Sequence, residues 1–103
     1  MKKINIKKLV GYKKSSIVSN ALIDKKAGNI TFFAFDKDSY ISPHKAPYDA
    51  VVILIEGNII VTLGKKEFKL NKNEMIIMPA GIIHSIKSLK KSKMILIMIK
   101  SNK

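Results

Sequence analysis

The chain has 103 residues, which suits a single domain, and 47% of them are hydrophobic, so it can bury a core. The absence of cysteine excludes disulfides, thiolate metal sites and cysteine nucleophiles. No apolar run approaches the roughly 18 residues that a membrane span needs, and no signal-peptide segment follows the basic N-terminus, so we expect a cytoplasmic protein.

Glycine and proline divide the sequence into short runs rich in β-branched residues, without a long helical pattern. Many such runs at close, regular spacing are typical of a β-sandwich or barrel. The sequence therefore predicts an all-β fold. The predicted strands cover residues 15–23, 29–35, 40–42, 51–55, 59–63, 67–70, 75–78, 83–88 and 94–100.

The net charge of +13 comes entirely from lysine, because the chain contains no arginine. Arginine supplies the bidentate contacts that grip phosphates and guanine edges. The lysine pairs are scattered over turns and chain ends, and aromatic residues do not alternate with them. We therefore do not expect a nucleic-acid partner.

Three predicted strands lack the alternation of apolar and polar residues that a strand with one wet face shows. They lie at 51–55, 75–78 and 94–99. Both faces of such strands need cover, and a chain of this size has few elements to provide it. We therefore predict a homodimer in which the sheets of two copies pack face to face. In the alternative, residues 4–10 cover the outer face in a monomer.

A turn built on Pro79 and Gly81 follows one of these apolar strands and leads to His84. This Pro-x-Gly-x-x-His spacing resembles the second sequence motif of the small cupins, a family with a jelly-roll barrel, also called a double-stranded β-helix. Asn73 stands at the leading glycine position of that motif, and Ser88 stands at its trailing asparagine position.

His44, the other histidine of the chain, resembles the first cupin motif together with Gly57, and the spacing between them is kept. Three positions depart from that motif. Asp38 replaces its leading glycine, Ala46 replaces its second histidine, and Ala50 replaces its glutamate.

The resemblance implies one cupin domain over residues 1–103. Its core barrel would span about 29–99, and additional N-terminal strands would lie within 4–23.

Cupins with a complete first motif usually bind a divalent metal through three histidines and one glutamate. By this resemblance, only His44 and His84 of those four ligands remain here. Two imidazoles give a weak and open site for Zn, Ni, Fe or Mn. Asp49 would complete a facial triad if it turned inward. It adjoins the vacated glutamate position, however, and neighbouring strand residues point to opposite faces unless a bulge intervenes.

The barrel interior is the expected ligand pocket. By strand alternation, Val52 and Leu54 share the face that the family points inward, and Phe33 and Phe35 could line the same lumen. Such apolar walls with two histidines suit a small, partly apolar ligand that carries one polar group. The predicted pocket residues are His44, His84, Tyr48, Asp49, Phe33, Phe35, Val52 and Leu54.

From these residues we expect a protein that binds a small molecule in its barrel, with a degenerate metal site. The resemblance also permits a metal-dependent isomerase, dioxygenase or decarboxylase that uses His44 and His84, and fold alone does not choose between these functions. The same two imidazoles could act as general acid and base near neutral pH. A structural or regulatory module is the third alternative.

Overall fold

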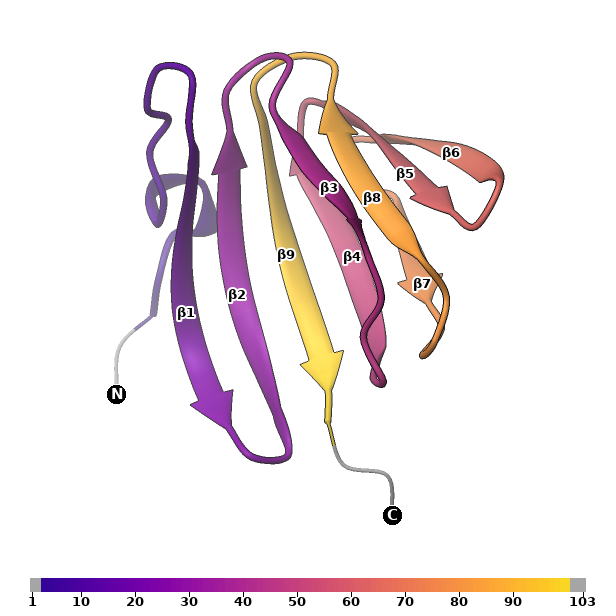
Figure 1. The fold of residues 1–103 in the computed structure, drawn as a ribbon. Coiled ribbons are helices and arrows are strands. Elements are labelled where there is room, and N and C mark those ends of the chain that lie inside the picture. Colours follow the sequence, from indigo (N-terminus) through magenta and orange to yellow (C-terminus); the bar gives the residue numbers. More distant parts are fainter. Residues whose placement is uncertain (1–2, 101–103) are drawn as a thin grey trace.

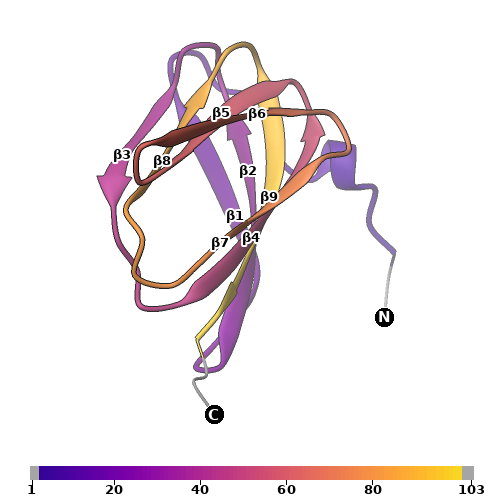
Figure 2. The same cartoon turned by 90° about the vertical axis from the view of Figure 1, so that its right-hand side faces the viewer.

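The structure, a computed structural model, describes residues 3–100. These residues form two antiparallel sheets that face each other around a common core (Figures 1 and 2). One sheet has five strands in the order β1-β2-β9-β4-β7, and the other has four in the order β3-β8-β5-β6. This arrangement confirms the predicted all-β jelly roll. The strands are β1 (Ile17–Lys25), β2 (Gly28–Phe35), β3 (Tyr40–His44), β4 (Asp49–Glu56), β5 (Asn58–Leu63), β6 (Lys66–Asn71), β7 (Met75–Met78), β8 (His84–Ser88) and β9 (Ser92–Ile99).

At all four positions where the two cupin motifs have glycine, the backbone has the left-handed conformation that favours glycine. Gly57 (φ 91°) and Gly81 (φ 80°) occupy the two turn positions where the cupin motifs keep glycine. The two motif glycines that this chain has replaced, at Asp38 and Asn73, also have positive φ, 61° and 72°. Aspartate and asparagine tolerate this left-handed conformation better than most residues, so the turns survive the replacements.

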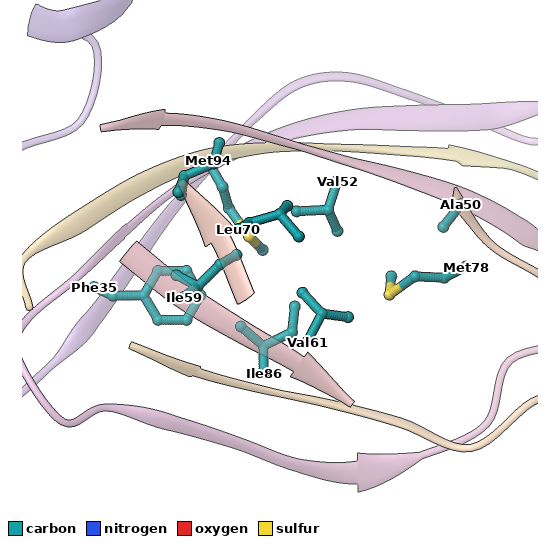
Figure 3. Packing of buried hydrophobic residues seen from close by; sticks show 10 residues of the cluster. Phe35, Ala50, Val52, Ile59, Val61, Leu70, Met78, Ile86 and Met94 are labelled. Carbon is teal, nitrogen blue, oxygen red and sulfur yellow. The ribbon is translucent and has the colours of Figure 1, made fainter. Parts of the chain in front are cut away.

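The core lies between the two sheets and is filled by alternate residues of each strand. In β4, Val52 and Leu54 are fully buried, while Val51 and Ile53 point to the outer face of the five-stranded sheet. Figure 3 shows Phe35 at one end of the buried cluster and Met78 at the other. Phe35 is fully buried, whereas Met78, at the opposite end, borders a cavity that the two histidines also line.

Of the N-terminal strands expected within residues 4–23, the structure forms β1, whereas residues 4–16 contain no strand. A short 3₁₀ helix, η1 (Ile6–Lys8), is capped by Asn5, whose side chain accepts a hydrogen bond from Lys7 N. The first strand begins only at Ile17. Within residues 3–100, no helix is long and apolar enough to cross a membrane.

After η1, the N-terminal segment packs on the outer face of the five-stranded sheet. Val10 is buried against Phe32 and Ala34. Two polar contacts hold the segment in place. The Tyr12 hydroxyl donates a hydrogen bond to the Glu56 carboxylate, and Lys93 Nζ donates to a backbone carbonyl of η1 at 2.5 Å. Burial and the neighbouring Glu56 raise the pKa of Tyr12 above its ordinary value, so the phenol stays a donor.

Candidate functional site

His44 and His84 face each other at one end of the barrel, on the neighbouring strands β3 and β8. Ile41 pairs with Ile86, but His44 pairs with His84, so β3 contains one more residue than β8 between these two pairs. This irregularity falls at Pro43, which can be tolerated because β3 is an edge strand and proline lacks an N–H for the ladder. The bulge returns His44 to the face that Ile41 occupies, and the two imidazole centroids lie 4.1 Å apart in an edge-to-face arrangement.

The turn before β8 is tied to the segment that joins β3 and β4. Gly81 N donates a hydrogen bond to Ala46 O at 2.8 Å, and Ala80 N donates to Asp49 Oδ1 at 2.9 Å. The Pro79 turn and the His44 segment are therefore held together by backbone donors rather than by packing alone.

A cavity of about 250 Å³ lies beside the histidine pair. Its walls are apolar except for the two imidazoles. His84 is 7% exposed, whereas His44 is exposed at the mouth. The lining residues are Phe33, Ile41, His44, Met78, His84, Ile86, Met94 and Leu96.

Comparison with known proteins identifies the family of the chain. The model of the cupin domain family matches residues 31–100. The chain belongs to the cupin family. No curated protein matches the chain.

Solved structures support the cupin fold over nearly the whole chain. A conserved protein of unknown function from Streptococcus pyogenes is 26% identical, with a TM-score of 0.94, over 99% of this chain and 90% of that chain. A cupin superfamily protein from Desulfitobacterium hafniense is 20% identical, with a TM-score of 0.92, over 97% and 92%. A cupin 2 conserved barrel domain protein from Leptotrichia buccalis is 34% identical, with a TM-score of 0.91, and the match covers 94% of this cupin but only 47% of that chain.

Three of the predicted pocket residues of this cupin line the cavity, namely Phe33, His44 and His84. The expected lining by Phe35, Val52 and Leu54 needs correction, because all three are fully buried in the core cluster. They do point inward, as alternation predicts, but they lie deeper in the barrel, where other core side chains fill the space.

The structure places Tyr48 and Asp49 outside the cavity lining. Asp49 is exposed, and its carboxylate accepts the hydrogen bond from Ala80 N instead of turning toward the histidines. Tyr48 is partly buried in the segment before β4.

Five lining residues were not predicted. Sequence alternation could have identified Ile86, which lies two residues after His84 on the same strand face. The others depend on strand pairing, which the sequence does not specify: Met94 pairs with Phe33, and Ile41 pairs with Ile86. The residues in question are Ile41, Met78, Ile86, Met94 and Leu96.

Burial is the main influence on the charge of His84. Removal of the ring from water lowers its pKa below the ordinary value of 6.5. The hydrogen bond to the Ile82 carbonyl opposes this shift in part, and the neighbouring His44 makes the smallest contribution, which lowers the pKa. His84 is therefore neutral at pH 7. A neutral imidazole can accept a hydrogen bond or bind a metal through its unprotonated nitrogen.

The donor set does not fit a resident catalytic metal. Catalytic metal sites generally use three protein ligands, and the cavity offers two imidazoles. Within residues 3–100, no group of three or more histidine, cysteine, aspartate or glutamate side chains could hold a metal ion. Ala46 and Ala50, at the family's other ligand positions, have no donor atom in their side chains.

Proposed function

We propose that this cupin binds a small molecule in the cavity beside His44 and His84, without a resident metal. The observation that carries the proposal is the composition of the cavity: apolar walls around about 250 Å³ with one polar spot made by the two imidazoles. A few polar groups in an apolar, largely preformed cavity are typical of small-molecule sites. The two imidazoles would orient the ligand through its polar group, and the apolar walls would bury its apolar surface.

A cavity-filling variant tests this proposal. Protein dialysed against a chelator is screened with a set of small fragments by ligand-observed NMR. Ile41→Phe extends a wall of the cavity and should abolish fragment binding. Ile60→Phe, on the outer face of the four-stranded sheet, is the matched control and should retain it. Binding that survives in Ile41→Phe, or that requires an added metal, would overturn the proposal.

The alternative of a metal-dependent isomerase, dioxygenase or decarboxylase has less support. It needs a further ligand beside His44 and His84, and the nearest carboxylate in sequence, Asp49, is hydrogen-bonded to the Pro79 turn. The imidazole pair alone could move a proton near neutral pH, so an acid–base activity without metal is compatible with binding in the same cavity.

We also propose that two copies of this cupin pack through the outer face of the five-stranded sheet. A row of aliphatic residues crosses all five strands in register. Its ends are well exposed, Ile23 at 47% and Ile77 at 60%, and the N-terminal segment packs on a different part of this face, around Val10. Exposed contiguous apolar surface of this kind marks association sites. The row consists of Ile23, Ile30, Ile97, Val51 and Ile77.

The cytoplasmic location stays a prediction from the sequence.

A further inference from the structure

The orientation of the two imidazoles determines which ring nitrogen carries the hydrogen. His44 Nδ1 lies 2.9 Å from Ser42 O, and His84 Nδ1 lies 3.3 Å from Ile82 O. A carbonyl oxygen can only accept, so each Nδ1 must be the protonated nitrogen that donates. A neutral imidazole has one N–H, and each Nε2 is therefore left with a lone pair.

The Nε2 atoms are accessible to a ligand. Among residues 3–100, no buried side-chain nitrogen or oxygen lacks a hydrogen-bond partner, and the hydrogen bonds of both rings are made by Nδ1. His84 is a buried residue, so its Nε2, which has no partner within this part of the chain, is not fully enclosed by protein. His44 is itself an exposed residue. The polar end of the cavity is thus lined by two imidazoles whose Nε2 atoms make no hydrogen bond within residues 3–100 and can accept one from a ligand.

The rest of the lining selects against anions. It contains no lysine, aspartate or glutamate, although the chain is rich in lysine elsewhere. A carboxylate or phosphate placed here would meet two lone pairs and no countercharge, and desolvation of an unpaired charge is costly. A group that donates a hydrogen bond would meet a suitable acceptor.

The size and side chains of the cavity favour a single ring. A cavity of about 150 Å³ is known to hold benzene, so about 250 Å³ leaves room for a ring with a short substituent. Phe33 and the thioethers of Met78 and Met94 are partners that aromatic rings contact favourably.

Building on the proposed function, we infer that the ligand is a neutral compound of the phenol class: one aromatic ring with a hydroxyl or N–H group that donates a hydrogen bond to an imidazole Nε2. His44 and His84 are the specificity-determining residues for that donor.

Two isomers of equal size test the role of the donor. Calorimetry compares p-cresol, which can donate, with anisole, which cannot, and with the anion benzoate. One hydrogen bond predicts that p-cresol binds about three- to tenfold more tightly than anisole. Benzoate should bind more weakly than p-cresol. The ratio of p-cresol to anisole affinity should fall toward one in whichever of His44→Leu and His84→Leu removes the accepting ring, while anisole binding is retained. An unchanged ratio in both variants would overturn the role of the imidazoles. His44 is exposed, so His44→Leu should fold even if His84→Leu does not.

The outcomes separate the ligand class from the proposed function. Equal affinity for p-cresol and anisole, or tighter binding of benzoate, would overturn the phenol class. The phenol class would also be overturned if none of the three probes bound while other fragments did bind in the cavity. Loss of that fragment binding in Ile41→Phe would show that it occurs in the cavity. If no fragment binds the wild-type protein, the proposed function fails and this inference fails with it.

Discussion

His44 lies directly opposite His84 across two strands, although the regular pairing of Ile41 with Ile86 would place Pro43 there. One extra residue in an edge strand therefore builds the polar end of the cavity. The same two residues are the remaining ligand positions of a metal-binding family motif. Because the other two positions are alanines, the proposed role of the pair is to accept a hydrogen bond rather than to chelate a metal.

The first prediction concerns metal content. Protein purified without an affinity tag should contain far less than one transition metal per chain by elemental analysis, because only two donors converge among residues 3–100. Added Zn or Ni should change the melting temperature little. Near-stoichiometric metal that is lost in His84→Ala would contradict this prediction.

The second prediction concerns acid stability. The pKa of His84 is lower in the folded chain than its ordinary value of 6.5, so the unfolded chain binds a proton that the folded chain does not. As the pH falls below about 6.5, the free energy of unfolding should decrease. The slope is at most one proton, about 1.4 kcal/mol per pH unit.

A matched variant isolates this effect. His84→Gln cannot titrate, so its difference in stability from wild type should be constant above pH 7 and should change between pH 6.5 and 5. Urea unfolding at several pH values measures it. Parallel pH profiles for the two proteins would show that His84 does not contribute.

The third prediction compares two turn glycines with positive φ. At Gly57, an added Cβ would lie 2.2 Å from Ser92 Oγ and 2.4 Å from Lys91 O, whereas at Gly64 it would meet nothing within 4 Å. Gly64→Ala should cost about 1–2 kcal/mol for the left-handed backbone alone. Gly57→Ala should cost about 3 kcal/mol or more, because overpacking adds to that strain. Denaturant unfolding measures both, and equal costs would contradict the close approach at Gly57.

The sequence predicted the strands of the fold better than the residues of the cavity, for physical reasons. The strands were predicted to within two residues of their ends because glycine and proline separate β-branched runs. For the N-terminal segment, the sequence predicted only in the alternative that residues 4–10 cover the outer face. The 3₁₀ helix was not predicted, and the position of the segment depends on a tertiary contact of Val10 with Phe32 and Ala34. In the site, alternation correctly assigned Phe35 and Val52 to the inner face. Alternation does not predict how far along the barrel each side chain lies. That position decides whether an inward-pointing side chain is buried in the core or lines the cavity.

The fourth prediction concerns association. Light scattering should give a mass near two chains for the wild-type protein. Ile97→Lys places a charge at the centre of the outer apolar row and should yield single chains, since two copies would bring like charges together in a dry interface. Ile60→Lys, on the other sheet, should remain a dimer. A wild-type mass near one chain would rule out the dimer.

Methyl NMR of the methionines tests the central claim most directly. Met78 and Met94 line the cavity, and Met75 is exposed on the outer face, so the methionines report on two separate places. In protein treated with chelator, a fragment that binds should shift the Met78 and Met94 methyl signals and leave Met75 unchanged. A shift at Met75 alone, or shifts at Met78 and Met94 only after metal is added, would contradict a metal-free ligand site beside His44 and His84.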